Sequence, residues 1–184
     1  MAKKLDKVLV IDVEATCWEG DPPPDQTSEI IEIGLCVLDL TTGERSAPRA
    51  IMVKPLHSSL SEYCTQLTTI TPEMLSEGLN FADACTLLQE EYHARQLTWA
   101  SYGDYDRLQF IKQCEEQDIP YPFGRTHINV KNLFALKLKL QREVGLRQVM
   151  ALLNRPFVGT LHRGADDAYN IAAVLSHILF EHEV

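Results

Sequence analysis

The sequence lacks paired cysteines, a long apolar run and an excess of basic charge, and each absence narrows the possible functions. Its five cysteines are scattered and never spaced as Cys-x-x-Cys, which argues against a disulfide framework and against a zinc site. No apolar stretch is long enough to span a membrane, and the basic N-terminus lacks the apolar core of a secretory signal. We therefore expect a cytoplasmic protein that does not associate with membranes.

The formal net charge of −9 bears on the kind of partner. Proteins that grip long duplex DNA usually present a basic surface, which this composition does not favour. If the chain handles nucleic acid, it should hold a short end locally, with a metal ion supplying positive charge. At 184 residues, of which 45% are hydrophobic, the chain can form one domain over residues 1–184, with its core at about 7–180.

The order of apolar patterns and turn signals predicts an α/β fold. Strands are expected at residues 8–13, 29–40, 50–53, 97–102 and 126–130. Helices are expected at residues 59–66, 72–77, 80–94, 105–117, 130–141, 146–153 and 165–182. Three leading strands precede an alternation of helices and strands, and turn residues at 41–44 indicate an antiparallel hairpin. The sheet should therefore be mixed, with helices on its faces.

Two carboxylates close the first predicted strand. Asp12 and Glu14 are one residue apart, and alternate residues of a strand point to the same face. Unpaired buried charges are costly, and a cation is the usual remedy, although a solvated strand end would also accommodate both groups. A divalent ion held by carboxylate oxygens indicates phosphate chemistry.

A third acid and a histidine lie at the start of the last predicted helix. At about 100° per residue, Asp167 falls on the same stripe as Ile171, the stripe that should pack on the sheet. Asp166 falls on the opposite face, where it suits solvent or the helix dipole. His162 lies just before this helix. Its side chain could project into the same crevice as Asp167, or it could be an ordinary surface residue. With the acids it would provide a group that takes a proton near neutral pH.

The fourth strand ends close to two further acids, Asp104 and Asp106. Ligands of open α/β sheets gather at such strand ends, so either acid could complete the set. Helical phase does not decide between them.

The ordered set of Asp12-x-Glu14, Tyr105-Asp106 and His162 with Asp167 resembles the DEDDh 3′→5′ exonucleases, and most closely the Eri1-like and KapD-like exoribonucleases. Three segments carry the closer resemblance: residues 12–17 (Asp-Val-Glu-Ala-Thr-Cys), 29–34 (Glu-Ile-Ile-Glu-Ile-Gly) and 67–71 (Leu-Thr-Thr-Ile-Thr). The resemblance implies an RNase H-like fold, with a five-stranded mixed sheet flanked by helices on both faces.

The resemblance also implies residue roles. Asp12, Glu14 and Asp167 would hold one Mg²⁺ or Mn²⁺, and Asp12 and Asp106 would bind a second. The family places an aromatic residue before this acid, which favours Asp106 over Asp104. Two ions can stabilise the attacking and leaving oxygens of a phosphodiester, while neutral His162 acts as general base. The product would be a nucleoside 5′-monophosphate.

Further residues resemble the family's substrate-binding segments. Leu67, Thr68 and Ile70 would cradle the terminal nucleotide, unless Leu67 and Ile70 are core residues at a helix end. Backbone amides near Ala15 and Thr16 could reach the terminal sugar. Tyr105, Tyr102 and Trp18 are candidates for base stacking, although Tyr102 and Trp18 could equally pack in the core or a loop. Arg163 and Lys131 could contact phosphates or simply be solvated.

We therefore expect a 3′→5′ exonuclease acting on the 3′ end of a single-stranded nucleic acid, with RNA favoured over DNA. The same chemistry on DNA is the nearest alternative, because no residue can be identified that would contact the 2′-hydroxyl. A non-catalytic binding module of the same fold and a phosphohydrolase of small nucleotides are more distant alternatives.

Overall fold

The computed structural model describes residues 5–181. The basic start of the chain and the predicted helix end at His182 lie outside these residues.

Five strands form one mixed sheet in the order β3-β2-β1-β4-β5. The strands are β1 (Lys7–Ala15), β2 (Ile30–Asp39), β3 (Arg49–Met52), β4 (Thr98–Ser101) and β5 (His127–Asn129). β1 and β2, and β2 and β3, pair antiparallel, whereas β4 pairs parallel with β1 and with β5. The predicted mixed sheet is confirmed.

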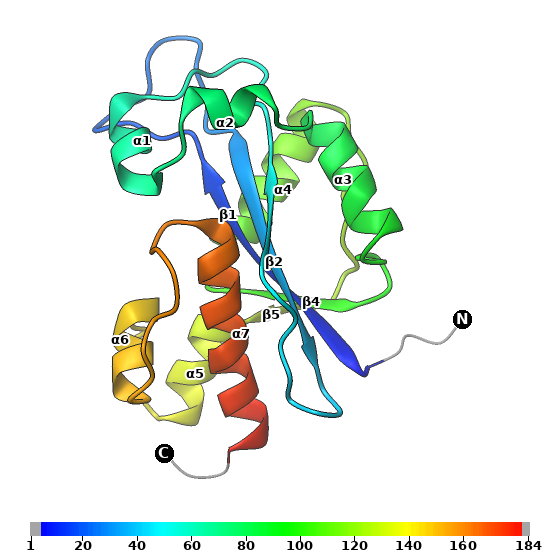
Figure 1. Cartoon of the computed structure of the whole chain (residues 1–184), viewed down its shortest axis with the longest axis vertical. Coiled ribbons are helices and arrows are strands. Elements are labelled where there is room, and N and C mark those ends of the chain that lie inside the picture. The colour runs from blue at the N-terminus through cyan, green and yellow to red at the C-terminus, as the bar shows by residue number, and fades with distance from the viewer. Residues whose placement is uncertain (1–4, 182–184) are drawn as a thin grey trace.

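The described residues contain seven helices. They are α1 (Glu62–Thr68), α2 (Pro72–Ser76), α3 (Phe81–Glu90), α4 (Tyr105–Glu116), α5 (Val130–Lys137), α6 (Leu146–Leu152) and α7 (Gly164–Phe180). Figure 1 shows α3 and α4 on one face of the sheet and α5, α6 and α7 on the other, with α1 and α2 beyond the end of β1. No helix within residues 5–181 has the length and apolar character needed to cross a membrane.

Three predicted helix ends were wrong, each because of local backbone chemistry. The first helix begins at Glu62, later than predicted, because the Ser61 side chain accepts a hydrogen bond from the Cys64 amide and caps it. The third ends at Glu90, and the chain soon turns through a left-handed residue, His93. The fifth ends at Lys137, followed by a left-handed Lys139. Left-handed residues cannot continue an α-helix.

Side chains from the two faces of β1 pack into two separate hydrophobic cores. Leu9, Ile11 and Val13 pack into the core beneath α3 and α4. Val8 and Val10 pack into the core beneath α5, α6 and α7. The alternation continues to the end of the strand, so Asp12 and Glu14 project on the side that α7 covers.

Two glycines allow the first turn of α7 to lie directly on the sheet. A Cβ placed on Gly34 would lie 1.7 Å from the carbonyl carbon of Gly164. Gly34 is also the β2 partner of Asp12. The absence of both side chains therefore brings the start of α7 to the same level of the sheet as the first carboxylate.

This contact predicts a large effect of adding one methyl group. Gly34→Ala should lower the free energy of unfolding by about 3 kcal/mol, because the helix must move away from the sheet. Gly145→Ala is the matched control: a Cβ there meets nothing within 4 Å, and the loss should stay below about 1 kcal/mol. Urea denaturation of the two variants measures both values, and similar stabilities would contradict the role of the contact.

Candidate active site

Three chain segments that are distant in sequence meet at the carboxyl end of β1. They are the end of β1 itself, the start of α4 after β4, and the loop that leads into α7 (Figure 1). Each segment carries at least one of the predicted acids. The site is therefore assembled by the topology of the sheet.

Asp106 is held at this point by the backbone of β1. Its side chain is buried, and its Oδ1 accepts a hydrogen bond of 2.9 Å from the Val13 amide. The same face of α4 carries two buried glutamines: Gln109 donates to the Ser28 carbonyl, and Gln113 accepts from the Ile30 amide. This stripe, Asp106 with Gln109 and Gln113, fixes α4 against the ends of β1 and β2.

Asp104 lies outside the cluster. It is exposed, and it forms an ion pair with Arg107 on its own helix at 3.2 Å. Helical phase placed the two acids on different stripes without showing which stripe faces the core. The structure buries Phe110 and Cys114, on the stripe of Asp106, and leaves Leu108, on the stripe of Asp104, exposed. The structure thus brings Asp106, and not Asp104, to the other acids.

The loop before α7 brings His162 to the remaining acids. The His162 amide donates to Asp167 Oδ2 at 2.7 Å, with the histidine backbone in the left-handed region at φ 62°. Ligand atoms of Glu14, His162 and Asp167 lie within 4.8 Å of one another. Asp167 is buried on the inner face of α7, as its position on the helix stripe predicts, while His162 lies at the exposed edge of the cluster.

Burial raises the pKa of all four acids, and repulsion by neighbouring carboxylates raises the pKa of Asp12, Glu14 and Asp167 further. Burial is the largest cause for Asp12, whose pKa lies well above its usual value, and repulsion by Asp106, Asp167 and Glu14 adds to it. Burial, followed by repulsion from Asp167, raises the pKa of Glu14 to about 8. Burial also raises the pKa of Asp167 to about 7 and that of Asp106 to about 6. Arg163 opposes the rise in the pKa of Glu14 only in part, so the cluster keeps an excess of negative charge.

The donor set fits a hard divalent cation. Four carboxylates converge, and Asp167 Oδ1 is buried without a hydrogen-bond partner. An orphaned carboxylate oxygen inside a protein is costly unless a cation compensates it. Oxygen ligands suit Mg²⁺ and Mn²⁺. Asp12, Glu14, Asp106 and Asp167 are the residues whose carboxylates would hold such a cation.

The segment predicted to cradle a nucleotide is largely structural. Ile70 is fully buried with Ile31, Cys64 and Leu75, and Thr68 is buried, with its hydroxyl donating to the Cys64 carbonyl. Direct substrate contact by these two side chains is therefore not supported, and for Ile70 the core alternative is correct. Leu67 is half-buried and can still contact a ligand.

The predicted backbone donor at Thr16 is already in use. Its amide donates to the Glu29 carbonyl at 2.8 Å, and its hydroxyl accepts from the Glu29 amide at 3.0 Å. Thr16 is fully buried, so the prediction that its amide reaches a terminal sugar was wrong. Ala15, the residue before it, is buried at the end of β1, next to Glu14.

The three aromatic residues predicted to stack on a base differ in how exposed their side chains are. Tyr105 is exposed at the first position of α4, next to Asp106, where it can stack on a base. Tyr102 donates its hydroxyl to the Val144 carbonyl at 2.6 Å and packs on the core below α5 to α7, so the structural alternative is correct. Trp18 is half-buried in the loop after β1.

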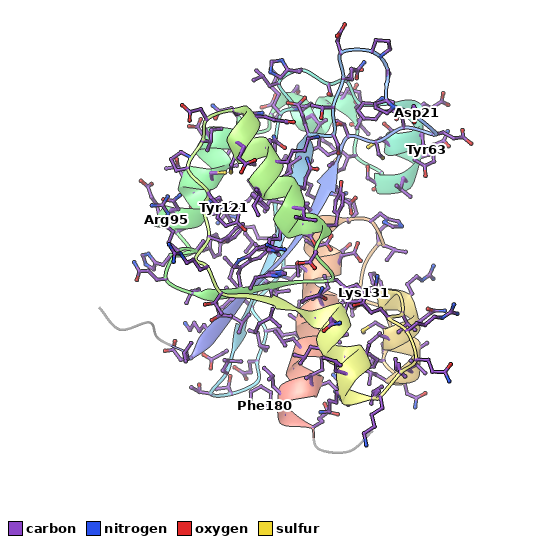
Figure 2. All side chains as sticks on the ribbon, turned by 180° about the vertical axis from the view of Figure 1, so that it is seen from behind. Asp21, Tyr63, Arg95, Tyr121, Lys131 and Phe180 are labelled. Carbon is purple, nitrogen blue, oxygen red and sulfur yellow. The ribbon has the colours of Figure 1, made fainter. Side chains whose placement is uncertain are left out.

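Both basic candidates for phosphate contact have acidic partners. Lys131 lies at the start of α5, as Figure 2 shows from behind, and its Nζ is 3.7 Å from Glu143. Arg163 donates from Nε to Glu32 Oε2 at 2.9 Å. Their charges are thus compensated within the protein, which weakens the prediction that they bind phosphates.

Two buried glutamates were missed. Glu29 accepts hydrogen bonds from the amides of Leu56, His57 and Ser58 and so holds the loop after β3. Glu32 is completely buried and faces Glu14 across β1 and β2. The role of Glu32 could have been inferred from the pairing of β1 with β2, because a residue paired with Glu14 lies on the same face of the sheet as Glu14.

The chain resembles known nucleases over most of its length. The profile of the exonuclease family RNase_T matches residues 9–175. The 3′-5′ exonuclease Snipper of Drosophila melanogaster is 29% identical over 190 residues, which cover 91% of this chain and 67% of Snipper. The 3′-5′ exoribonuclease 1 of Homo sapiens is 29% identical, with coverage of 95% and 52%. The chain thus spans between half and two thirds of these relatives.

Solved structures show the same fold. The nuclease domain of 3′hExo, a DEDDh family member bound to rAMP, superimposes with a TM-score of 0.88 at 26% identity, covering 99% of this chain and 96% of that one. A 3′-exonuclease that recognises the 3′ end of a histone mRNA stem-loop gives a TM-score of 0.85 at 26% identity, with coverage of 98% and 66%. Both similarities extend over nearly the whole chain.

The placement of Asp106 predicts a sharp contrast with its neighbour. Asp106→Asn should weaken Mn²⁺ binding by on the order of tenfold or more, because a ligand charge is lost while the amide oxygen can still accept from Val13. Asp104→Asn should bind Mn²⁺ as the unchanged protein does. Isothermal titration calorimetry compares them, and an equal effect of both changes would contradict the assignment.

The raised pKa values predict how stability depends on pH. With carboxyl pKa values of about 6 to 8 in the folded protein, against 3.8 to 4.5 when unfolded, the metal-free fold holds protons that the unfolded chain has released. Stability without metal should therefore fall as the pH rises from 5 to 8.5, and Mn²⁺ should restore it.

Removing one carboxylate charge tests whether the buried acids destabilise the metal-free protein. Asp12→Asn should increase the free energy of unfolding at pH 8.5 in chelator by on the order of 1–2 kcal/mol and abolish stabilisation by Mn²⁺. Urea denaturation at both pH values, with Asp104→Asn as the exposed-acid control, provides the measurement. A metal-free protein that is more stable at pH 8.5 than at pH 5 would refute this.

Proposed function

The chain belongs to the RNase_T exonuclease family, and on that basis we propose that it removes nucleoside 5′-monophosphates from the 3′ end of single-stranded RNA or short 3′ overhangs, using divalent metal ions. The observation that carries the proposal is the convergence of four carboxylates beside one histidine at the end of β1. Such a set suits phosphodiester hydrolysis, because it combines metal ligands with a group that accepts a proton.

The protein side chains have distinct roles in this proposal. Bound Mg²⁺ or Mn²⁺ would polarise the phosphate and stabilise the charge that develops on it. Asp12, Glu14, Asp106 and Asp167 would hold two such ions. The His162 imidazole, at the exposed edge beside Glu14 and Asp167, accepts the proton of the attacking water. This role requires the neutral imidazole.

RNA is the favoured substrate for three reasons. Two relatives are named as exoribonucleases or as binding an RNA 3′ end, and 3′hExo was crystallised with rAMP. The net charge of −9 disfavours a grip on long duplexes and suits local capture of one strand end. Exposed Tyr105 and half-buried Leu67 can contact the terminal base.

The cysteines bear on where the protein acts. All five are free, four of them buried. A reducing compartment keeps such thiols unpaired, and a cytoplasmic location is accordingly part of the proposal.

The proposal predicts shortening of RNA from one end only. With 5′-labelled single-stranded RNA and Mg²⁺ or Mn²⁺, the label should appear in progressively shorter products with 5′-monophosphate release. Chelator and Asp12→Ala should each reduce the rate by at least about a thousandfold, because catalysis depends on bound metal. Denaturing gels and thin-layer chromatography of the nucleotides provide the readouts.

Matched substrates define the specificity. A 3′-phosphorylated RNA should be cut poorly, and DNA of the same sequence should be cut more slowly than RNA. Equal rates on RNA and DNA would indicate a general exonuclease, and internal cleavage or no shortening at all would refute the proposal.

A further inference from the structure

One buried acid has no place in the metal site described above. Glu32 is completely buried in β2, opposite Glu14 in the strand register. It adds to the negative charge around Asp12, Glu14 and Asp167. A fifth carboxylate at this position is costly in free energy, so a compensating interaction should exist.

The compensation comes from the loop that carries the histidine. Arg163 Nε donates to Glu32 Oε2 at 2.9 Å, and the Ala165 amide approaches Glu32 Oε1 at 3.3 Å. Arg163 turns inward for this contact, with only 24% of its side chain exposed. The pair joins residues that are far apart in sequence, and it ties the first turn of α7 to the centre of the sheet.

The residue next to Arg163 is His162, whose backbone is in an unfavourable conformation. Its φ of 62° lies in the left-handed region, which a non-glycine residue adopts only when its surroundings hold it there. Two acids supply that restraint from either side. Asp167 accepts a hydrogen bond from the His162 amide at 2.7 Å, and Glu32 accepts hydrogen bonds from Arg163 and Ala165, one and three residues further along the chain.

We propose that the Glu32–Arg163 pair is a positioning device that fixes the left-handed turn at His162 and so keeps the imidazole beside Glu14 and Asp167. Holding the Arg163 side chain inward leaves its neighbour free to face the cluster. This inference rests on the proposed function, in which His162 accepts a proton, and it assigns Arg163 to the geometry of the turn.

Binding of substrate phosphate by Arg163 makes a different prediction. A phosphate contact would act mainly on substrate affinity, so its loss would raise KM. A positioning role acts on the alignment of the proton acceptor, so its loss lowers kcat while KM changes little. The two roles are therefore separable by steady-state kinetics on the same RNA.

The decisive variants are Arg163→Gln, Glu32→Gln and the double change. Each single change should lower kcat about tenfold or more with KM within about threefold, since a displaced imidazole accepts the proton poorly. The double change should cost less than the product of the single effects, because each single change leaves one partner unsatisfied. Arg163→Lys, which keeps the charge, should recover part of the lost rate.

A second readout does not depend on activity. In metal-free protein, hydrogen exchange followed by NMR should show the His162 amide at least about fivefold less protected in both single variants, because the turn that carries it opens more often. Arg49→Gln is the matched control: it removes a surface ion pair with Glu91 at the sheet edge and should change neither readout. Melting temperatures verify that all variants are folded at the assay temperature.

The outcomes separate the two proposals. Faster exchange at His162 with reduced kcat supports the positioning role, whereas unchanged exchange in both single variants overturns it. An Arg163→Gln effect confined to KM also overturns it, in favour of phosphate contact. If the unchanged protein does not shorten RNA, the proposed function fails, and the exchange data alone then decide whether the pair holds the turn.

Discussion

The burial of four carboxylates at one strand end is the constraint on which this structure depends. Burial raises the pKa of Asp12, Glu14, Asp106 and Asp167, and neighbouring charges raise the pKa of Asp12, Glu14 and Asp167 further. Such a cluster lowers the stability of the fold at neutral pH and persists only if the surrounding structure holds it in place. The two hydrophobic cores, one on each face of β1, provide that support.

Two helices hold the acids in place by different means. α4 uses polar side chains, since Asp106, Gln109 and Gln113 bond directly to the backbone of β1 and to the chain entering β2. α7 instead uses the absence of side chains, because Gly34 and Gly164 let it lie against the sheet. Both devices act on the same end of β1, so the relative position of their acids is fixed within one rigid unit.

Much of this arrangement could be predicted from local patterns. The period of two in β1 placed Asp12 and Glu14 on one face, and the period of the last helix placed Asp167 toward the sheet. What could not be predicted depended on pairing between distant segments. The roles of Glu32 and Thr16 follow from the register of β1 with β2 and with the segment that leads into β2, which no local pattern specifies.

The choice between Asp104 and Asp106 likewise could not be made from a local sequence pattern. Helical phase left both open, because which stripe of α4 faces the core depends on how the helix packs on the sheet. The motif resemblance favoured Asp106, the acid that the structure buries beside Val13. Resemblance succeeded here because it carries information about packing between distant segments that periodicity lacks.

The order in which the chain is made adds a consequence of α7 being its last described helix. His162 and Asp167 leave the ribosome after every strand of the sheet, and domains form from the N-terminus during synthesis. A partly made chain can therefore build most of the sheet while lacking its proton acceptor and one metal ligand. On the proposed function, a nascent chain gains hydrolytic competence only after α7 has been synthesised.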